Sequence, residues 1–374
     1  EIERTGFLKT NLMLGNALVN MYAKMGALNL AQEVLGQLSI QDVVSMTSLI
    51  AGYVENGYDD EALDCFQKMQ IEGLTPDAVT LVCCLKACGN IGDLEKGQII
   101  HAELARGGLL ESKNVGNALI CMYVKLGSLS KAIETLKNIA IQNVVSWNTL
   151  IYGCAEGGYG EEALRCFKQM EQEGYLPDVV TLVSALKACS SIGAMHEGQK
   201  MHIEIEKVGL LDENQDVGTM LVDMYVKCGL LLTALKVFDK LTVRGVVPWT
   251  AIISGYVKYG YDMEALKLYQ KMQVEHISPN TVTYIFVLKA CSRTGAVQKG
   301  QQIHINIEIR GLLETDMAIG NSLVGMYANL GCFTIAQHVF DTLQVRDEVS
   351  WVTLISGFVE NGYADMGLIY FKKM

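Results

Sequence analysis

The chain has 374 residues, half of them hydrophobic (50%), and a formal net charge of −11. Polar residues interrupt the apolar ones every few positions, so no stretch is apolar for long enough to form a transmembrane helix. The acidic charge is atypical of nucleic-acid-binding proteins, which are usually basic. The chain starts at Glu1 without a signal or transit segment and stops within a repeated frame. We therefore expect it to be a fragment of a longer protein.

Three sequence frames alternate along the chain in a fixed order. The first is GNALVNMYAKMG from Gly15, the second VVSMTSLI from Val43, and the third TLVCCLKACGNIG from Thr80. The second frame returns at positions 144, 246 and 348, with nearly constant flanks. Such a long fixed period is typical of repeat architectures, and three frames per period give units of about 34 residues.

Each unit is predicted to form two antiparallel helices. In the unit that starts at Val43, the apolar residues that share one helical face are Leu49, Ile50, Tyr53 and Val54. A glycine follows the first helix at Gly57, Gly127, Gly158, Gly229, Gly260, Gly331 and Gly362. Stacked helix pairs form a superhelix whose first helices line the concave groove. We therefore expect one continuous all-α solenoid rather than several globular domains.

Cysteine and histidine recur at fixed places in the third frame. Cys88, Cys189 and Cys291 share one position, which favours small buried hydrophobic residues in a reducing compartment over a disulfide framework. His101, His202 and His304 share another position, which favours packing or capping over catalysis. The sequence has no Cys-x-x-Cys, no phosphate loop and no G-x-S-x-G turn. We expect no metal, no cofactor and no catalysis within this chain.

The frames resemble the pentatricopeptide repeat family of plant organelles, in its subclass of alternating P, L and S units. The P units carry VVSWNTLI, the L units LKAC, and the S units GNALI followed by MY. The Trp-x2-Leu-Gly-x2-Tyr pattern of tetratricopeptide repeats is absent. The resemblance implies a right-handed superhelical α-solenoid of helix-turn-helix units of about 31–36 residues. It also implies a location in the chloroplast or the mitochondrion.

The motifs divide the chain into one solenoid of ten complete units between two partial ones. The units are a partial L at 1–11, then S 12–42, P 43–77, L 78–112, S 113–143, P 144–178, L 179–214, S 215–245, P 246–280, L 281–316, S 317–347 and a partial P at 348–374.

The fifth and last residues of each unit vary while the frame around them is constant. In such a groove they would form a row of polar side chains, and a helical repeat can read one splayed RNA base with two or three side chains. Asparagine donates and accepts hydrogen bonds, whereas aspartate only accepts. The pairs are Asn16/Asp42, Thr47/Asp77, Asn117/Asn143, Asn148/Asp178, Thr219/Gly245, Thr250/Asn280 and Asn321/Asp347, and the L units carry Val82/Ser112, Val183/Asn214 and Ile285/Asp316. The alternative is that these residues only satisfy local backbone groups.

The resemblance implies that threonine at the fifth position goes with purines and asparagine with pyrimidines. Read in this way, the chain suggests the single-stranded RNA 5′-U-G-n-C/U-U-n-n-A-n-U-3′. The resemblance also implies that apolar residues at the second position stack on the bases. These are Met13, Val44, Val79, Val145, Val180, Val247, Val282 and Val349, whereas Asn114, Asp216 and Ala318 depart from the pattern.

Basic residues recur further along the first helices, where they either meet phosphates or face solvent. They are Lys24, Lys125, Lys227, Lys258 and Arg293. Acidic residues concentrate at the starts of the second helices, as in Asp59-Asp60-Glu61 and Glu161-Glu162, which we expect on the convex side. An RNA complex of this chain should therefore depend less on salt than that of a basic binder.

The predicted function is sequence-specific binding of single-stranded RNA, one base per unit, in organellar RNA editing, processing or stabilisation. Editing-factor proteins are further expected partners, and a membrane is not. The alternative is a helical-repeat scaffold that binds a protein or peptide in its groove. An enzyme would need a catalytic set absent from this segment, and a deaminase-like domain would lie outside it.

Overall fold

The computed structural model describes residues 11–139 and 142–374, so the predicted partial unit at 1–11 lies, except for Asn11, outside the described residues. The described secondary structure is entirely helical, in agreement with the predicted all-α class. None of the described helices is both long and apolar enough to cross a membrane. The chain forms two compact bodies, which are described separately: a first body that ends at Ile192 and a second body from Gly193 to Met374.

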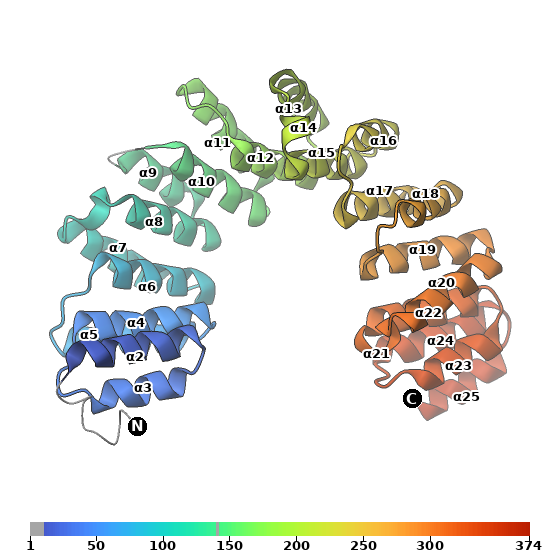
Figure 1. Ribbon diagram of the computed structural model, residues 1–374, viewed down its shortest axis with the longest axis horizontal. Coiled ribbons are helices and arrows are strands. Elements are labelled where there is room, and N and C mark those ends of the chain that lie inside the picture. Colours follow the sequence, from blue (N-terminus) through green and yellow to red (C-terminus); the bar gives the residue numbers. More distant parts are fainter. Residues whose placement is uncertain (1–10, 140–141) are drawn as a thin grey trace. The chain divides into compact units, whose positions relative to one another are not determined.

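The first body consists of helices that pack against their neighbours in chain order (Figure 1). They are α2 (Leu12–Lys24), α3 (Leu28–Gln37), α4 (Val43–Glu55), α5 (Asp59–Ile71), α6 (Ala78–Ile91), α7 (Leu94–Arg106), the 3-10 helix η2 (Leu109–Glu111), α8 (Lys113–Lys125), α9 (Leu129–Asn138), α10 (Val144–Glu156), α11 (Gly160–Gln172) and α12 (Val179–Ile192).

The second body continues the same plan of helix pairs. Its helices are α13 (Met195–Val208), α14 (Leu210–Glu213), α15 (Gln215–Lys227), α16 (Leu231–Lys240), α17 (Val246–Lys258), α18 (Asp262–Val274), α19 (Thr281–Thr294), α20 (Val297–Ile309), α21 (Leu312–Thr315), α22 (Met317–Asn329), α23 (Phe333–Thr342), α24 (Glu348–Glu360) and α25 (Ala364–Lys373). Both bodies therefore have the architecture of an α-solenoid, with pairs of antiparallel helices stacked on one another.

Glycine ends the first helix of a pair because the chain turns there through the left-handed region. Gly57 has φ 79°, and its N–H donates to the Val54 carbonyl while the next N–H, of Tyr58, donates to the Tyr53 carbonyl. These bonds satisfy helix-end carbonyls, and a side chain at φ > 0 would be strained. All seven glycines predicted at this turn have φ between 68° and 84°, which confirms the predicted break.

The core lies between the two helices of each pair and between successive pairs. The predicted buried face of α4 is confirmed, since Leu49, Ile50, Tyr53 and Val54 are all buried. The repeated cysteines Cys88, Cys189 and Cys291 are fully buried and none forms a disulfide. Burial raises the pKa of the Cys88 thiol to about 11, so it stays protonated and packs as a small hydrophobic group.

Glycines set the distance between first helices of successive pairs. An added Cβ on Gly52 of α4 would lie 2.6 Å from Ala23 Cβ and 3.1 Å from Ala23 Cα of α2. Two equivalent positions are as close: a Cβ on Gly255 of α17 would lie 2.4 Å from Val226 Cγ1 of α15, and one on Gly357 of α24 would lie 2.3 Å from Ala328 Cβ of α22. At Gly153 of α10 the corresponding distance, to Val124 Cγ1, is 3.2 Å. Real Cβ atoms do not approach as closely as at the first three positions, so the helix spacing depends on those glycines.

The repeated histidines join the second helix of one pair to the first helix of the next. In each body the histidine Nδ1 is hydrogen-bonded to a tyrosine hydroxyl: His101 to Tyr123 at 2.8 Å, His202 to Tyr225 at 2.8 Å, and His304 to Tyr327 at 3.1 Å. The two rings also meet edge to face. The predicted packing role of these histidines is therefore confirmed.

Candidate nucleic-acid interface

The second residue of most first helices is an exposed apolar side chain. Exposed fractions run from 46% at Val282 to 84% at Met13. The complete set is Met13, Val44, Val79, Val145, Val180, Val247, Val282 and Val349, all of them predicted stacking residues. Single exposed apolar residues are ordinary, but the same exposed place in eight helices is not a requirement of the core. At this place Asn114, Asp216 and Ala318 are exposed as well.

The fifth residue of a repeat lies beside the last residue of the same repeat. Asn148 Nδ2 donates to both carboxylate oxygens of Asp178, each at 2.9 Å. Asn16 Nδ2 likewise donates to Asp42 Oδ1 and Oδ2, at 3.2 and 2.9 Å. The structure therefore brings the two predicted side chains together, one turn beyond the exposed second residue of the helix.

The other predicted pairs vary in how directly they meet. Asn321 Nδ2 donates to Asp347 Oδ1 at 3.3 Å. Thr250 Oγ1 donates to Asn280 Oδ1, also at 3.3 Å. Thr47 and Asp77 do not bond each other, although both bond the Thr80 hydroxyl, at 2.6 and 2.8 Å. Asn117 and Asn143 share no hydrogen bond among the described residues, and Gly245 of the pair Thr219/Gly245 offers no side chain.

The last residue of a repeat is also the N-cap of the next first helix. The Asp42 carboxylate accepts from the Ser45 N–H at 2.9 Å, and Asp178 does the same for Thr181 at 2.9 Å. The side chains with this role in front of P and L repeats are Asp42, Asp77, Asn143, Asp178, Asn280 and Asp347. An N-cap side chain stabilises a helix by about 1 kcal/mol relative to alanine. The local role that the sequence left as an alternative is therefore present in addition to the pairing with the fifth residue.

A buried hydroxyl that the sequence analysis missed completes this site. The third residue of the following helix bonds both members of the pair: the Ser350 hydroxyl donates to Asn321 Oδ1 at 2.6 Å and lies 2.7 Å from Asp347 Oδ1. Equivalent hydroxyls occur on Thr80, Thr181 and Thr283, and all are fully buried. The signal was the Asp/Asn-x-x-Ser/Thr spacing in front of every P and L repeat from Val43 onward except the one that follows Gly245, and this spacing resembles a capping box.

Hydrogen bonds keep three of the cap carboxylates, those of Asp42, Asp178 and Asp347, ionised. Burial alone would raise the pKa of Asp178, but bonds from the Thr181 N–H and the Asn148 amide hold that pKa below its usual range. The Asp42 pKa is lowered in the same way, against burial, by the Ser45 N–H and the Asn16 amide. The Ser350 hydroxyl and N–H lower the pKa of Asp347. These groups are therefore hydrogen-bond acceptors at neutral pH, with lone pairs left for a further donor.

Replacement of Asp178 by asparagine is expected to remove part of the acid sensitivity of the fold. A depressed carboxyl pKa stabilises the folded state above its usual value near 3.9, and the stabilisation is lost as pH falls through the folded pKa. Asn is about as good an N-cap as Asp but does not titrate. The difference in Tm between parent and Asp178→Asn, followed by circular dichroism, should narrow from pH 5 to pH 3. A difference that stays constant over this range would contradict the proposed role of the charge.

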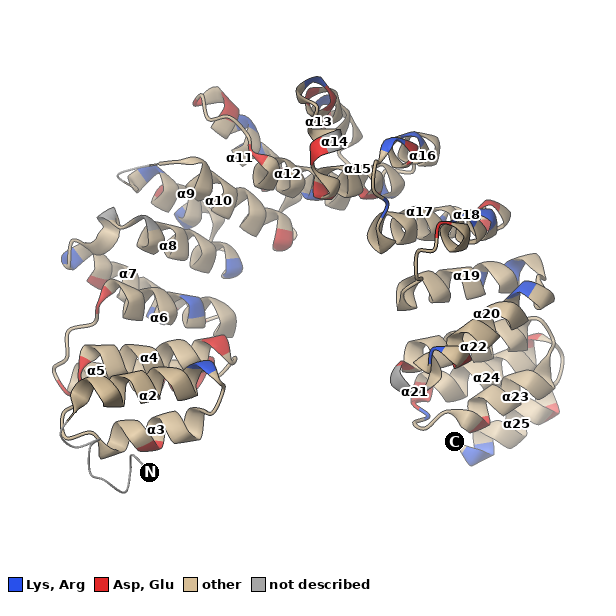
Figure 2. Ribbon diagram, in the orientation of Figure 1, with Lys and Arg blue, Asp and Glu red and all other residues tan. Residues whose placement is uncertain are grey.

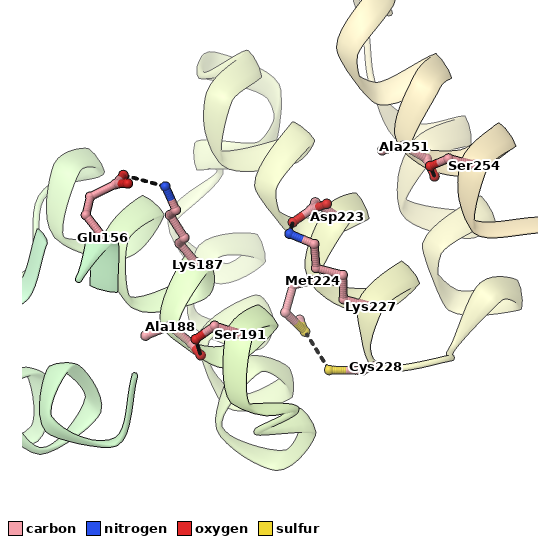
Figure 3. A network of polar contacts seen from close by, with 10 residues as sticks. All are labelled: Glu156, Lys187, Ala188, Ser191, Asp223, Met224, Lys227, Cys228, Ala251 and Ser254. Atoms are coloured by element: carbon pink, nitrogen blue, oxygen red, sulfur yellow. Dashed lines mark hydrogen bonds and ion pairs between the residues drawn. The ribbon is translucent and has the colours of Figure 1, made fainter. Parts of the chain in front are cut away.

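The five basic residues predicted near phosphates have different surroundings. Lys227 pairs with Asp223 at 2.8 Å (Figure 3) and Lys125 donates to the Asn90 side chain at 2.6 Å. Arg293 bonds the buried Asp262 carboxylate and the Val257 carbonyl. Lys258 lies over the Tyr259 ring, and Lys24 has no partner among the described residues. At least two of the five charges are thus balanced by a carboxylate.

Two of the acids at second-helix starts are buried rather than on an outer face. Asp59 accepts from the Asn90 amide at 3.0 and 3.1 Å, and Asp262 accepts from Arg293. Their neighbours in the following first helix cover them, which the expected convex placement did not include. Figure 2 shows basic and acidic residues interspersed along the helices of each body. Among the described residues, no group of three His, Cys, Asp or Glu side chains could hold a metal ion.

Comparison with known proteins decides the family. The sequence model of the PPR repeat family matches residues 41–90, 142–191 and 244–293, and that of the PPR repeat matches 117–140, 219–246 and 349–374. The chain belongs to the pentatricopeptide repeat family. The resemblance inferred from its motifs is thereby confirmed at the level of the family.

Several pentatricopeptide repeat proteins of Arabidopsis thaliana are similar to this chain. Pentatricopeptide repeat-containing protein At1g11290, chloroplastic, is 32% identical over 99% of this chain and 46% of its own length. Pentatricopeptide repeat-containing protein At3g09040, mitochondrial, is 33% identical over 98% of this chain and 36% of its own length. The chain spans about half the length of the curated relatives it matches.

A solved structure confirms the fold. The crystal structure of the pentatricopeptide repeat protein PPR10 in complex with an 18-nt psaJ RNA element matches with a TM-score of 0.75 at 17% identity. The match covers 96% of this chain and 55% of PPR10. The pentatricopeptide repeat chain described here therefore has the solenoid fold of its family.

Proposed function

We propose that this chain binds single-stranded RNA with sequence preference, one base per repeat. The observation that carries the proposal is the hydrogen-bonded pair Asn148/Asp178, which lies next to the exposed Val145 and Val180. A carboxylate and an amide side by side offer acceptors and donors to a base edge, while exposed apolar side chains on successive first helices offer faces for stacking. The structure of PPR10 in complex with an 18-nt RNA element supports this reading.

The register of P, L and S repeats is part of the proposal. Two differences among the helix pairs support it. A short helix follows the second helix of each L repeat, namely η2, α14 and α21. The second helix has ten residues in the S repeats (α3, α9, α16 and α23) and thirteen in the complete P repeats (α5, α11 and α18). In this register the suggested RNA is 5′-U-G-n-C/U-U-n-n-A-n-U-3′. The L repeats have an apolar fifth residue, so the base at each of them is left unspecified.

The cellular role follows from the relatives. Their names place them in the chloroplast or the mitochondrion, and we assign this chain to one of these organelles, in RNA editing, processing or stabilisation. The segment itself acts by binding. A deaminase-like domain, and contacts with editing-factor proteins, would belong to the whole protein. A peptide-binding scaffold is the rival, and it leaves the pairing of Asn or Thr with Asp or Asn without a purpose.

Replacing Thr47 with asparagine tests the proposal. The introduced amide would face Asp77 as Asn148 faces Asp178, so the pair Asn148/Asp178 shows the arrangement that we expect in the variant. We expect the parent to prefer G, and Thr47→Asn to prefer U, at the second nucleotide of the suggested RNA. The preference should be on the order of tenfold, or about 1.4 kcal/mol. The measurement is a fluorescence anisotropy titration of both proteins against both ten-nucleotide RNAs.

The control is Thr47→Ser, which keeps the hydroxyl that bonds Thr80 and should keep the preference for G. Equal binding of both RNAs by all three proteins would exclude base reading in this repeat. Absence of binding even at low salt would favour the peptide scaffold.

A further inference from the structure

We propose that the L repeats hold the RNA backbone, through Lys86, Lys187 and Lys289. This inference rests on the RNA-binding function proposed above and assigns a role to the repeats whose base is unspecified. The three lysines occupy one position, the lysine of each LKAC frame, in α6, α12 and α19.

The lysines lie on the same helical stripe as the predicted stacking residues. In α6, the residues of this stripe that are not buried begin with Val79 and continue through Val82 and Cys83 to Lys86. Steps of three and four residues place side chains one above another on an α-helix. In α12 the same stripe is narrower and consists of Val180, Val183 and Lys187. A base stacked on the valine would therefore have its backbone within reach of a long basic side chain further along the helix.

These lysines are available, unlike several of the basic residues predicted from the sequence. The side chains of Lys86 and Lys289 are exposed and make no ion pair or hydrogen bond among the described residues. Lys187 pairs with Glu156 of α10, as Figure 3 shows, and both side chains remain about 40% exposed. Exposed ion pairs of this kind contribute little to stability, so a phosphate can replace the carboxylate.

The residue opposite each lysine differs among the three L repeats. The helices α4/α6, α10/α12 and α17/α19 pack in the same register, because Thr47–Thr80, Asn148–Thr181 and Thr250–Thr283 form equivalent hydrogen bonds. The positions equivalent to Glu156 are therefore Glu55 opposite Lys86 and Lys258 opposite Lys289.

The third site thus has two cations where the first two have one cation and one anion. We expect the strongest phosphate contact at Lys258/Lys289. At Lys187 we expect a weaker contact, because the Glu156 carboxylate competes with the phosphate for the lysine.

The test compares two triple variants that change the net charge equally. The first is Lys86→Gln/Lys187→Gln/Lys289→Gln. The control is Lys137→Gln/Lys236→Gln/Lys267→Gln, whose lysine side chains are exposed on the second helices α9, α16 and α18 and have no partner among the described residues. The probe is the suggested ten-nucleotide RNA, titrated at salt concentrations from about 50 to 200 mM, with folding checked by circular dichroism.

Loss of three phosphate contacts should reduce the slope of log K against log salt by about 2, since each contact on a single strand contributes about 0.7. The advantage of the parent over the first variant should therefore shrink roughly twentyfold across this salt range. The preference for G at the second nucleotide should remain, because phosphate contacts carry no base information. Lys289→Gln alone should cost more affinity than Lys86→Gln alone, and Glu156→Gln should increase affinity.

A slope for the first variant that equals that of the control variant would overturn the inference while leaving RNA binding intact. Loss of base preference together with an unchanged slope would show that the lysines act on base reading and would also overturn it. A parent that binds no RNA even at the lowest salt concentration would overturn both this inference and the proposed function.

Discussion

Replacement of Trp249 by alanine is expected to lower the free energy of unfolding of the second body by about 3–5 kcal/mol. Trp249 is fully buried in α17, and its ring meets Phe238 of α16 edge to face at 4.6 Å. Its indole Nε1 has no hydrogen-bond partner among the described residues, and Lys271 Nζ lies 6.0 Å from the ring centroid, so the loss is mainly one of packing. Alanine would leave a cavity between two repeats that the surrounding helices fill only in part.

The chain contains its own control for this substitution. Met46 occupies the equivalent position in α4 and is also fully buried. Trp249→Met should therefore cost much less than Trp249→Ala, because methionine adapts to irregular space. Urea unfolding followed by circular dichroism measures both variants. Hydrogen exchange should localise the loss of protection to α15–α18, since solenoid repeats are stabilised mainly by their neighbours. Equal stability of parent and alanine variant would contradict this account of the core.

Replacement of Gly52 by alanine is expected to destabilise the first body by about 1–3 kcal/mol, the usual effect of overpacking. The added methyl group would lie 2.6 Å from Ala23 Cβ and 3.1 Å from Ala23 Cα, so α2 and α4 would have to move apart. A backbone atom cannot relieve such a contact by changing rotamer, whereas the end of a long side chain can.

Gly36 provides the matched control, because it is an exposed glycine within α3 with nothing within 4 Å of an added Cβ. Gly36→Ala should stabilise the first body by up to about 1 kcal/mol through helix propensity. Thermal unfolding of the two variants should thus shift the Tm in opposite directions. Shifts of the same sign would show that helix propensity, and not the distance between helices, governs both sites.

The helix pairs could be predicted from the sequence because their signals are local and repeated. The apolar face of α4 and the break at Gly57 both follow from spacing alone. The short helices that follow the second helix of each L repeat were missed, although each follows a glycine with φ > 0 in the sequence Gly-Leu-Leu, as at Gly108 and Gly209. A turn of three or four residues is too short to give a periodic signal.

The candidate site could be predicted only in part, because some of its contacts are made across repeats. The pairing of Asn148 with Asp178 followed from their places in the repeat, since one lies early in a first helix and the other lies just before the next first helix. The burial of Asp59 could not be predicted, since it depends on an amide 31 residues away, that of Asn90. The bridging hydroxyl of Thr181 was missed because candidate residues were chosen by their variation among repeats, and this position belongs to the constant frame.

The N-cap at the last position also bears on how such a protein can evolve. The residues found there are aspartate, asparagine, serine and glycine, as in Asp42, Asn143, Ser112 and Gly245. All four are among the residues that begin helices well, and exchanges among them cost a few tenths of a kcal/mol to about 1 kcal/mol. If the same position selects the base, the residues that select different bases are the same residues that begin a helix well. A single substitution can then redirect one repeat to a new nucleotide while the scaffold stays folded, so new targets can arise without a preceding gain in stability.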